Sequence, residues 1–279
     1  MRRILVAIDF SSDSFNALEH GLLMANSMKT HLRIVHVKKS DEFVIPYNPE
    51  NGESNKTLPL EEYLATVLNK YQDSYEVEGG IFDFKIRKGN VYVEITNQAH
   101  YDDSFMIIVG THGASGFKEY LLGSNAFRVV DKAMCPVLTV RHGFMPEPIR
   151  KIVVPLDVTN QTRIKVPFAI DIAMAYGAEI HALGVYETST KEVVARISQY
   201  VDQVCEHITN RGVTVVKETI SGTNITDMTI EYAKNIHADM IIIMTEQTER
   251  PENIFLGPYP QQMVNHSPIP VLSIHPADK

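Results

Sequence analysis

The sequence lacks most features that mark secreted or membrane proteins. It contains two cysteines in 279 residues, Cys135 and Cys205, which lie in different halves of the chain in largely apolar surroundings. Two buried free thiols in a reducing compartment explain this better than a disulfide. No apolar run approaches the roughly 20 residues that span a bilayer. The opening MRRILVAIDF lacks a cleavage signature and predicts a first strand, not a signal peptide. We therefore expect a cytoplasmic protein with no membrane partner.

The charge balance argues against another class of partner. The formal net charge is −8 at pH 7, because acidic residues outnumber Lys and Arg by 34 to 26. Since nucleic-acid-binding proteins carry a basic footprint, no nucleic-acid partner is predicted. Hydrophobic residues make up 44% of the chain and charged residues 22%, as in a soluble globular protein. The length fits one large domain or two ordinary ones.

Several enzyme motifs are also missing. No G-x-x-x-x-G-K-[ST] sequence occurs, so the lysine that usually supports phosphoryl transfer is absent. The GASG run from Gly113 to Gly116 lacks the spacing of a nucleophile elbow. No histidine or cysteine pair has zinc-ligand spacing. The SSDS run, Ser11–Ser14, only faintly resembles the S-G-G-x-D-S loop of ATP pyrophosphatases, because both glycines are missing. No catalytic residue and no metal ligand is predicted.

What the chain does contain is a strand, a glycine-rich loop and a helix between Met106 and Val130. Met106–Val109 is a short apolar run typical of a buried strand, and a segment of helical periodicity follows Gly123. Glycine permits close approach of an anion, and a helix N-terminus adds partial positive charge. Either Ser124 or Asn125 is expected to cap this helix or to bond a phosphate directly. Many glycine-rich loops are simple turns, so the spacing of the glycines has to decide whether this loop indicates an anion site.

The spacing is more specific than the glycines alone. Gly110 and Gly113 are followed by nine residues and then by Gly123-Ser124. This pattern resembles the ATP-binding signature of the universal stress protein family, G-x-x-G-x9-G-S. Three further segments resemble strands of that family: ILVAIDFS at Ile4–Ser11, HLRIVHV at His31–Val37 and CPVLTVR at Cys135–Arg141.

The alternation of elements indicates a parallel sheet. Strands are predicted at Ile4–Ile8, Leu32–Val37, Phe82–Arg87, Met106–Val109 and Val137–Val140. Helices are predicted after the capping residues Ser11–Ser14, over Leu60–Glu78, over Val91–Tyr101 and after Gly123. Asp41–Pro59, with three prolines and three asparagines, is predicted to be an irregular loop or lid. Strands alternating with helices favour right-handed crossovers in an α/β fold.

The same pattern then begins again. Arg3–Asp9 is repeated by Lys151–Asp157 at an offset of 148 residues (157 − 9), and Gly123 by Gly257 at 134 (257 − 123). The difference corresponds mostly to Asp41–Pro59, which has no counterpart. We therefore predict a first copy at residues 1–143 and a second copy at 149–279. The resemblance implies two tandem Rossmann-like domains of the adenine nucleotide alpha hydrolase type, each a five-stranded parallel sheet flanked by helices.

The two copies differ in the glycine-rich segment. Gly110-Thr-His-Gly113 becomes Met244-Thr-Glu-Gln247, and Gly123-Ser124 becomes Gly257-Pro258. The new side chains carry Cβ atoms where close approach is needed, proline removes an N–H donor, and glutamates repel phosphate. The motif is therefore intact in the first copy and degenerate in the second, which predicts one nucleotide per chain.

Ligands of parallel α/β sheets bind at the carboxyl ends of strands. Asp9, Val37 and Gly110 fall at such ends. The resemblance implies ATP as the cofactor, with Mg²⁺ as an accompanying ion, and assigns adenine, ribose and phosphate contacts to Ala7, Ile8, Asp9, Val37, Val109, Gly110, His112, Gly113, Gly123, Ser124 and Asn125. Two of these have simpler interpretations: Asp9 as a helix cap and His112 as a solvated loop residue. Because neither Asn125 nor the alanine after it has a hydroxyl group, any hydroxyl contact that the family makes at these positions is in doubt here.

Two hypotheses for function follow. One is a regulatory ATP-binding protein in the stress response, in which bound nucleotide biases conformation or partner contacts. The other is an interaction module that binds no nucleotide, and slow ATP hydrolysis is a third alternative. The strand order implied by the resemblance places the apolar last strands, Val137–Val140 and Val271–Ile274, at sheet edges. We predict that they pair with each other as an intramolecular pseudo-dimer, because exposed apolar edges invite pairing; the alternatives are edges that face solvent or pair between chains. Further homodimerisation through an apolar patch at Ile254–Leu256 and Tyr259 is left open.

Overall fold

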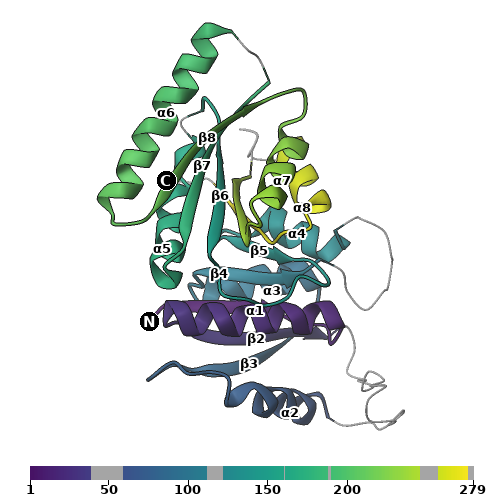
Figure 1. Ribbon diagram of the computed structural model, residues 1–279. Helices are drawn as coiled ribbons and strands as arrows, with labels where there is room; N and C mark the ends of the chain where they lie inside the picture. Colours follow the sequence, from purple (N-terminus) through teal and green to yellow (C-terminus); the bar gives the residue numbers. More distant parts are fainter. Residues whose placement is uncertain (39–58, 112–121, 160, 188–189, 246–256, 276–279) are drawn as a thin grey trace.

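The computed structural model describes residues 1–38, 59–111, 122–159, 161–187, 190–245 and 257–275. Strands and helices alternate in the first copy, as the sequence predicts (Figure 1). Its elements are β1 (Arg3–Ala7), α1 (Ser12–Met28), β2 (His31–Lys38), α2 (Leu60–Gln72), β3 (Phe82–Lys88), α3 (Val91–Tyr101), β4 (Met106–Gly110), α4 (Ser124–Lys132) and β5 (Val137–Val140).

The second copy repeats this order, with a short 3₁₀ helix before its first α-helix. Its elements are β6 (Lys151–Leu156), the short 3₁₀ helix η1 (Gln161–Arg163), α5 (Val166–Tyr176), β7 (Glu179–Tyr186), α6 (Lys191–Asn210), β8 (Val215–Ser221), α7 (Ile225–Asn235), β9 (Met240–Met244), α8 (Pro258–His266) and β10 (Val271–Ile274). Each copy therefore contributes five strands, which confirms the α/β fold predicted from the sequence.

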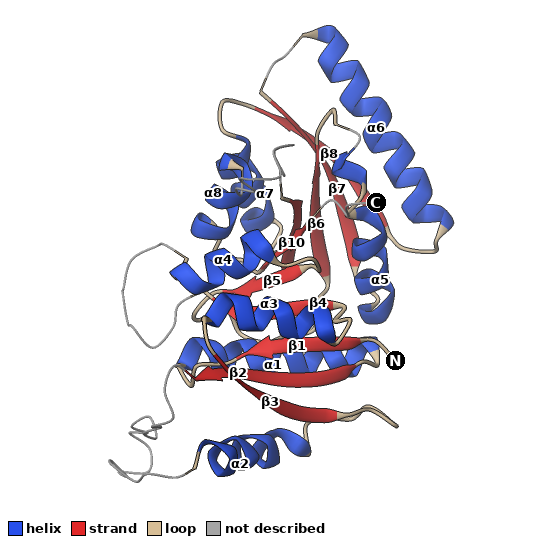
Figure 2. Cartoon of the chain, turned by 180° about the vertical axis from the view of Figure 1, so that it is seen from behind, coloured by secondary structure: helices blue, strands red, loops and turns tan. Residues whose placement is uncertain are grey.

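The ten strands of the described residues form one continuous sheet (Figures 1 and 2). The strand order is β3-β2-β1-β4-β5-β10-β9-β6-β7-β8, so the order in the first copy is mirrored in the second. Pairing is parallel within each copy, and β5 and β10 pair antiparallel where the copies meet. The sheet thus has an approximate two-fold relation at this β5–β10 seam.

The seam buries the two apolar edges that the sequence predicts to pair. Leu138 lies opposite Leu272, and Val137 opposite Ser273. Every residue of β5 and β10 is buried. The hydroxyl of Thr139 also donates to the carbonyl of Val271 at 3.2 Å. Because each edge satisfies the other inside one chain, the internal pair protects both from intermolecular pairing.

Helices cover both faces of the sheet, with a hydrophobic core under each face. One core includes Leu18 of α1 and Ile170 of α5, together with inward residues of the strands. The other includes Val129 of α4 and Met263 of α8. Apart from their half-buried end residues, β1, β4, β6 and β9 are buried on both sides, and their interior residues form continuous apolar runs. Full burial of one such side chain contributes about 1.5–3 kcal/mol.

The helix predicted over Leu60–Glu78 ends earlier, at Gln72. The amide of Asn26 explains the difference, because it donates to the carbonyl of Ser74 at 2.8 Å and accepts from the N–H of Glu76 at 2.9 Å. The hydroxyl of Tyr75 also donates to the carbonyl of Thr30 at 2.8 Å. These long-range bonds hold the chain out of the helical path, and a local sequence pattern does not reveal them.

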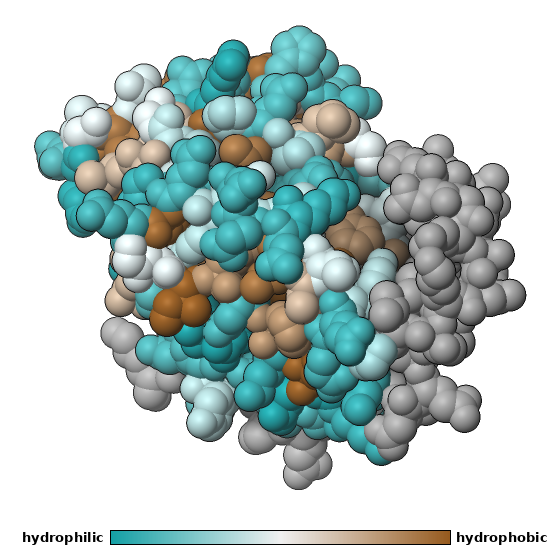
Figure 3. Space-filling view, turned by 90° about the horizontal axis from the view of Figure 1, so that it is seen from below, coloured by the Kyte–Doolittle hydropathy of each residue, from teal (hydrophilic) through white to brown (hydrophobic). Residues whose placement is uncertain are grey.

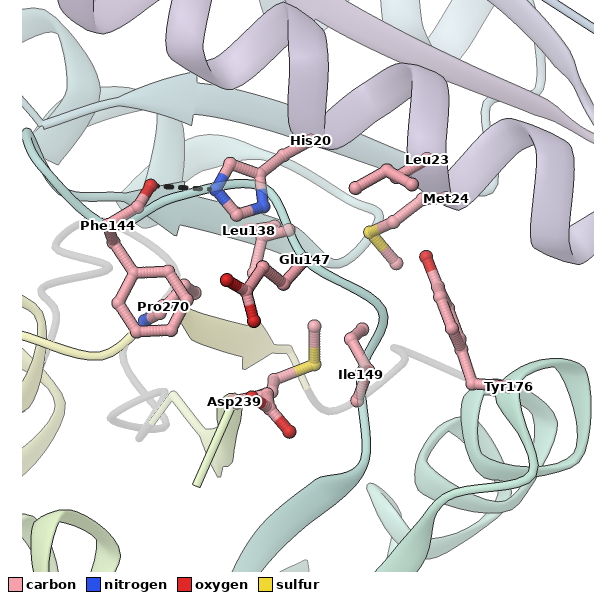
Figure 4. Close-up of a pocket in the computed structure, with 11 residues that line it drawn as sticks. His20, Leu23, Met24, Leu138, Phe144, Glu147, Ile149, Tyr176, Asp239 and Pro270 are labelled. Carbon is pink, nitrogen blue, oxygen red and sulfur yellow. Dashed lines mark hydrogen bonds between the residues drawn. The ribbon is translucent and has the colours of Figure 1, made fainter. Parts of the chain in front are cut away.

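A small cavity lies between the two copies (Figure 4). It is lined by His20 of α1, Phe144 and Glu147 of the connecting segment, and Tyr176 of α5, among others. His20 contacts the carbonyl of Phe144 at 3.2 Å and stacks on its ring at 6.0 Å between centroids. The cavity volume of about 10 Å³ is near the lower limit for one water molecule. The cavity is part of the contact between the two copies and is too small for a nucleotide.

The exposed large hydrophobic residues are scattered along the described parts of the chain. On the face shown in Figure 3, hydrophobic residues form small areas separated by hydrophilic ones. The patch proposed for a homodimer lies mostly outside the described residues, and its remaining member, Tyr259, is half-buried. Both cysteines are free and half-buried, not fully buried as predicted. Among the described residues, no helix combines the length and apolar character needed to cross a membrane.

Candidate functional site

Strands β1, β2 and β4 of the first copy end at the same edge of the sheet. Ala7 pairs with Val35, and Val6 pairs with Ile108. The register therefore places the ends of these strands, and the residues directly after them, along one rim. They are Ala7, Ile8, Asp9, Val37, Val109 and Gly110. Their shared position follows from the parallel sheet, whereas their contact with a ligand remains a prediction.

Burial limits what each rim residue can offer. Ile8, Val37 and Val109 are no more than 9% exposed, so their side chains belong to the core beneath the rim. The backbone of Ile8 is already engaged, because its N–H donates to Val35 at 2.9 Å and its carbonyl accepts from Nδ1 of His36 at 2.9 Å. Asp9 is exposed and is therefore the polar side chain at the end of β1 that solvent or a ligand can reach.

Asp9 stabilises the turn that leads into α1. Its Oδ1 accepts from the backbone N–H of Ser11 at 3.1 Å and from the hydroxyl of Ser11 at 2.5 Å. Ser11 is the N-cap of α1, and its hydroxyl accepts from the N–H of Ser14 at 3.2 Å. The predicted capping by Ser11–Ser14 is thus confirmed, and Asp9 acts on the N-cap residue instead of capping the helix itself.

The corresponding turn of the second copy has the same geometry. Oδ1 of Asp157 accepts from the N–H of Thr159 at 2.7 Å and from its hydroxyl at 2.6 Å. Because this copy has the degenerate glycine motif, the aspartate fulfils a structural role that needs no nucleotide. Its retention in both copies is therefore not evidence for a second binding site.

An aromatic cluster behind Asp9 was not predicted from the sequence. Phe10 adopts φ 67°, a left-handed conformation that is unusual for a bulky residue. Its ring stacks on His36 at 4.5 Å and meets Tyr63 of α2 edge-on at 4.9 Å. Burial lowers the pKa of His36, so a neutral ring takes part in the stack. This packing fixes the backbone that carries Asp9. The sequence shows the three rings, but not that they meet.

Gly110 has a packing reason to be glycine. A Cβ added there would lie 2.8 Å from the carbonyl oxygen of Asp13 and 2.9 Å from its carbonyl carbon. These are backbone atoms of the first turn of α1, which cannot move without shifting the helix. Glycine therefore allows α1 to begin close against the end of β4, whether or not a phosphate binds nearby.

The N-terminus of α4 lies beside the end of β4. The N–H of Thr111, directly after β4, donates to Val140 at 3.0 Å, and its carbonyl accepts from the N–H of Gly123 at 2.7 Å. Gly123 is the N-cap and has no side-chain capping bond, so neither Ser124 nor Asn125 caps this helix, and the alternative, a direct bond to a phosphate, stays a prediction. Both lie within the first turn of α4 and are exposed. His112 and Gly113 lie outside the described residues.

The first turn of α4 is suited to an anion. It contains no acidic residue. Its first N–H groups have no partner inside the helix, and they carry the positive end of the helix dipole. Arg128, one turn later, is exposed and lies over the ring of Tyr92 at 5.2 Å. Among the described residues, no group of three His, Cys, Asp or Glu could hold a metal ion.

Comparisons with known proteins identify the fold family. Residues 1–141 and 148–275 each match the family described as "Universal stress protein family". The chain belongs to the universal stress protein family.

Relatives and solved structures agree with this assignment. The chain is 30% identical to universal stress protein YxiE of Bacillus subtilis over 145 residues, which is 50% of this chain and 98% of that protein. It is also 30% identical over 146 residues to Rv2624c of Mycobacterium tuberculosis, covering 50% and 48%. A universal stress protein structure from Archaeoglobus fulgidus superposes over 98% of both chains with a TM-score of 0.74 at 20% identity, which shows a shared fold.

The second universal stress domain begins its first helix later than the first does. At the offset of 148 residues, the start of α1 at Ser12 corresponds to position 160, whereas α5 starts at Val166. The short helix η1 replaces the missing turns. Met244 stands where Gly110 stands in the first domain, and its side chain packs against the core that includes Ile170. Because a side chain at this position leaves no room for a helix start as close as that of α1, the glycine-to-methionine change accounts for the altered helix start.

A buried lysine occupies the rearranged segment. Lys165 is 3% exposed, and its ammonium donates to the hydroxyl of Thr162 at 3.0 Å. Burial lowers the pKa of Lys165 from 10.5 to about 8, with the charge of Asp157 acting in the opposite direction. At the same offset the first domain has Ala17, which is fully buried in the core. The second domain therefore holds a cation where the first has a methyl group.

This lysine should make the stability of the protein depend on pH. Below pH 8 Lys165 is charged in the folded and unfolded states, so the folded state bears the full cost of burial; the cost disappears as pH rises towards 10.5. Lys165→Met should therefore stabilise the protein by up to about 3 kcal/mol at pH 7. The advantage should shrink between pH 8 and 10. Urea unfolding of both proteins across this range checks the prediction, and a constant difference would contradict it.

Proposed function

We propose that this universal stress protein binds one molecule of ATP per chain, in its first domain, and uses the bound nucleotide for regulation in a stress response. The nucleotide-binding domain is taken as residues 1–143 and the degenerate copy as residues 149–279. Adenine and ribose are assigned to the rim formed by Ala7, Asp9 and Val37, and the phosphates to Gly110, Ser124 and Asn125 together with the loop between them. Val109 and Gly123 contribute backbone, and Ile8 supports the rim.

The observation that carries this proposal is the uncapped N-terminus of α4. Its first turn is exposed, has no acidic residue, and lies beside the carboxyl end of β4. The second copy provides an internal comparison, because α8 begins with Pro258 and has one donor fewer in the same turn. A phosphate chain fits the first arrangement and fits the second poorly.

The proposal assigns a regulatory role to the nucleotide and does not include its turnover. A magnesium ion bound with ATP would be held mainly by the phosphates, since Mg²⁺ commonly takes one or two protein carboxylates and keeps several waters. Asp9 is the carboxylate at the rim, and Ser11 already donates two hydrogen bonds to it. This engagement favours a structural and ribose-binding role for Asp9 over general-base catalysis.

Release of the bound ligand tests the proposal against an interaction module that needs no nucleotide. We expect the purified protein, after denaturation, to release adenine nucleotide that absorbance and mass spectrometry identify as ATP or its hydrolysis product. Protein stripped of ligand should bind added ATP saturably in a calorimetric titration. If it neither releases a nucleotide nor binds added ATP, the interaction module becomes the better account. ADP accumulating during incubation with ATP would favour the slow ATPase.

A further inference from the structure

A hydrogen bond from the second domain reaches the residue that precedes the N-cap of α4. The backbone N–H of Leu122 donates to Oδ1 of Asn265 at 3.1 Å. Asn265 lies in the last turn of α8, and α4 and α8 lie side by side across the seam (Figures 1 and 2). We propose that Asn265 is a positioning residue for the nucleotide site of the other domain. The inference rests on the proposed function, since it concerns the same site.

The hydrogen bond between Leu122 and Asn265 lies in a buried environment, where its loss would be costly. Leu122 is 8% exposed, and its side chain packs in the core that includes Val129. A buried backbone N–H that has no partner destabilises the folded protein by more than a typical hydrogen bond contributes. Because the donor is an N–H, the atom of the Asn265 amide that faces it must be the oxygen. The second domain therefore supplies the acceptor that Leu122 needs.

Asn265 is itself held by the first domain. A guanidinium nitrogen of Arg141, directly after β5, donates to the backbone carbonyl of Asn265. This carbonyl belongs to the C-terminal end of α8, where a positive charge is favourable. The side chain of Asn265 thus acts on α4, and its backbone is fixed by the residue after β5. Both contacts cross between the domains.

The hydrogen bond from Leu122 to Asn265 fixes the C-terminal side of the glycine-rich segment. On its N-terminal side, Thr111 is fixed to Val140 by a hydrogen bond of 3.0 Å. On its C-terminal side, Leu122 is fixed to Asn265, and the next residue, Gly123, is the N-cap of α4. A displacement of Leu122 moves Gly123 and the first N–H groups of α4 with it. The direction in which these groups point decides how well they bind a phosphate.

The neutrality of Asn265 agrees with this role. At the offset of 134 residues, the equivalent position of the first domain is Asp131. A carboxylate at position 265 would still accept from Leu122, but it would place a negative charge beside the proposed phosphate site. An amide provides the acceptor without this repulsion. Two variants therefore separate the hydrogen-bond acceptor from the neutrality of the side chain. Asn265→Leu removes the acceptor, whereas Asn265→Asp keeps it and adds a negative charge.

The test uses the full chain and combines two measurements. Amide hydrogen exchange reports on the N–H of Leu122 without any ligand, and calorimetry compares ATP with adenosine, which has no phosphates. Asn265→Leu should speed exchange at Leu122 roughly fivefold or more and weaken ATP binding roughly five- to tenfold, as loss of one hydrogen bond predicts. Adenosine affinity should stay nearly unchanged. Asn265→Asp should keep exchange slow and still weaken ATP binding.

Gln262→Leu is the matched control, because Gln262 lies one turn earlier on α8 and accepts from Thr226 of its own domain at 3.2 Å. It should alter neither measurement. Unchanged exchange at Leu122 in Asn265→Leu would overturn the proposal, as would an equal loss of ATP and adenosine affinity, which indicates general destabilisation. If the wild-type protein binds neither ligand, the proposed function fails, and the exchange measurement alone decides whether Asn265 positions α4.

Discussion

Replacing Ser124 with proline should lower the affinity for ATP roughly ten- to a hundredfold without unfolding the protein. The substitution removes a backbone N–H and a hydroxyl from the exposed first turn of α4, and hydrogen bonds to charged groups contribute about 1.5–3 kcal/mol each. Proline is tolerated at the first position of a helix. Gly123 already has φ −56° and ψ 142°, which suits a residue before proline. Calorimetric titration measures the affinity, and thermal unfolding checks the fold.

Pro258→Ser is the matched control for this variant. It restores the donor in the second domain, but Met244 still occupies the position of Gly110, so no second site should appear. An unchanged ATP affinity in Ser124→Pro would mean that α4 does not hold the phosphates. A melting temperature lowered by more than about 10 °C would instead indicate that proline disrupts the helix, since 1 kcal/mol corresponds to about 2–4 °C for a chain of this size.

Replacing Leu138 with aspartate should destabilise the whole chain severely. Leu138 is 1% exposed and lies opposite the fully buried Leu272 in the β5–β10 seam. The change removes a buried apolar side chain and places a charge without a partner in the core, at a cost of more than about 4 kcal/mol. Because one seam joins both domains, we expect a single unfolding transition at a much lower denaturant concentration, measured by fluorescence or circular dichroism in urea.

The control for the seam is an exposed residue at the far edge of the sheet. Lys85 of β3 is exposed, so Lys85→Gln should change the free energy of unfolding by less than about 0.5 kcal/mol. If Leu138→Asp unfolds at nearly the same urea concentration as this control, the two domains do not depend on the seam for their stability.

Much of the fold could be predicted from local patterns. The ranges predicted for α3, β5 and β10 match those in the structure, and those predicted for β1, β2, β3 and β4 differ by one residue at one or both ends. Their signals are short apolar runs and helical periodicity, which local sequence carries directly. The end of α2 could not be predicted, because Asn26 of α1 holds Ser74 and Glu76 by long-range hydrogen bonds. The later start of α5 likewise depends on packing against Met244.

Some features of the candidate site could likewise be predicted from the sequence, and others could not. The carboxyl-end rule places Asp9, Val37 and Gly110 on one rim, and the register of β1, β2 and β4 agrees. The sequence could not show that Gly110 packs against Asp13, because that contact depends on how α1 lies on β4. It also could not show the bond from Leu122 to Asn265, which joins residues 143 positions apart across the seam. Contacts between domains leave no local pattern.

The number of nucleotides per chain tests the central claim most directly. Native mass spectrometry of the full chain counts them at an ATP concentration that just saturates the wild-type protein, with Mg²⁺ present and with Ser124→Pro and Pro258→Ser measured beside it. We expect one nucleotide on the wild-type chain, one on Pro258→Ser, and a loaded fraction of Ser124→Pro well below half. Two nucleotides on the wild-type chain, or one retained at full occupancy by Ser124→Pro, would contradict a single site at the N-terminus of α4.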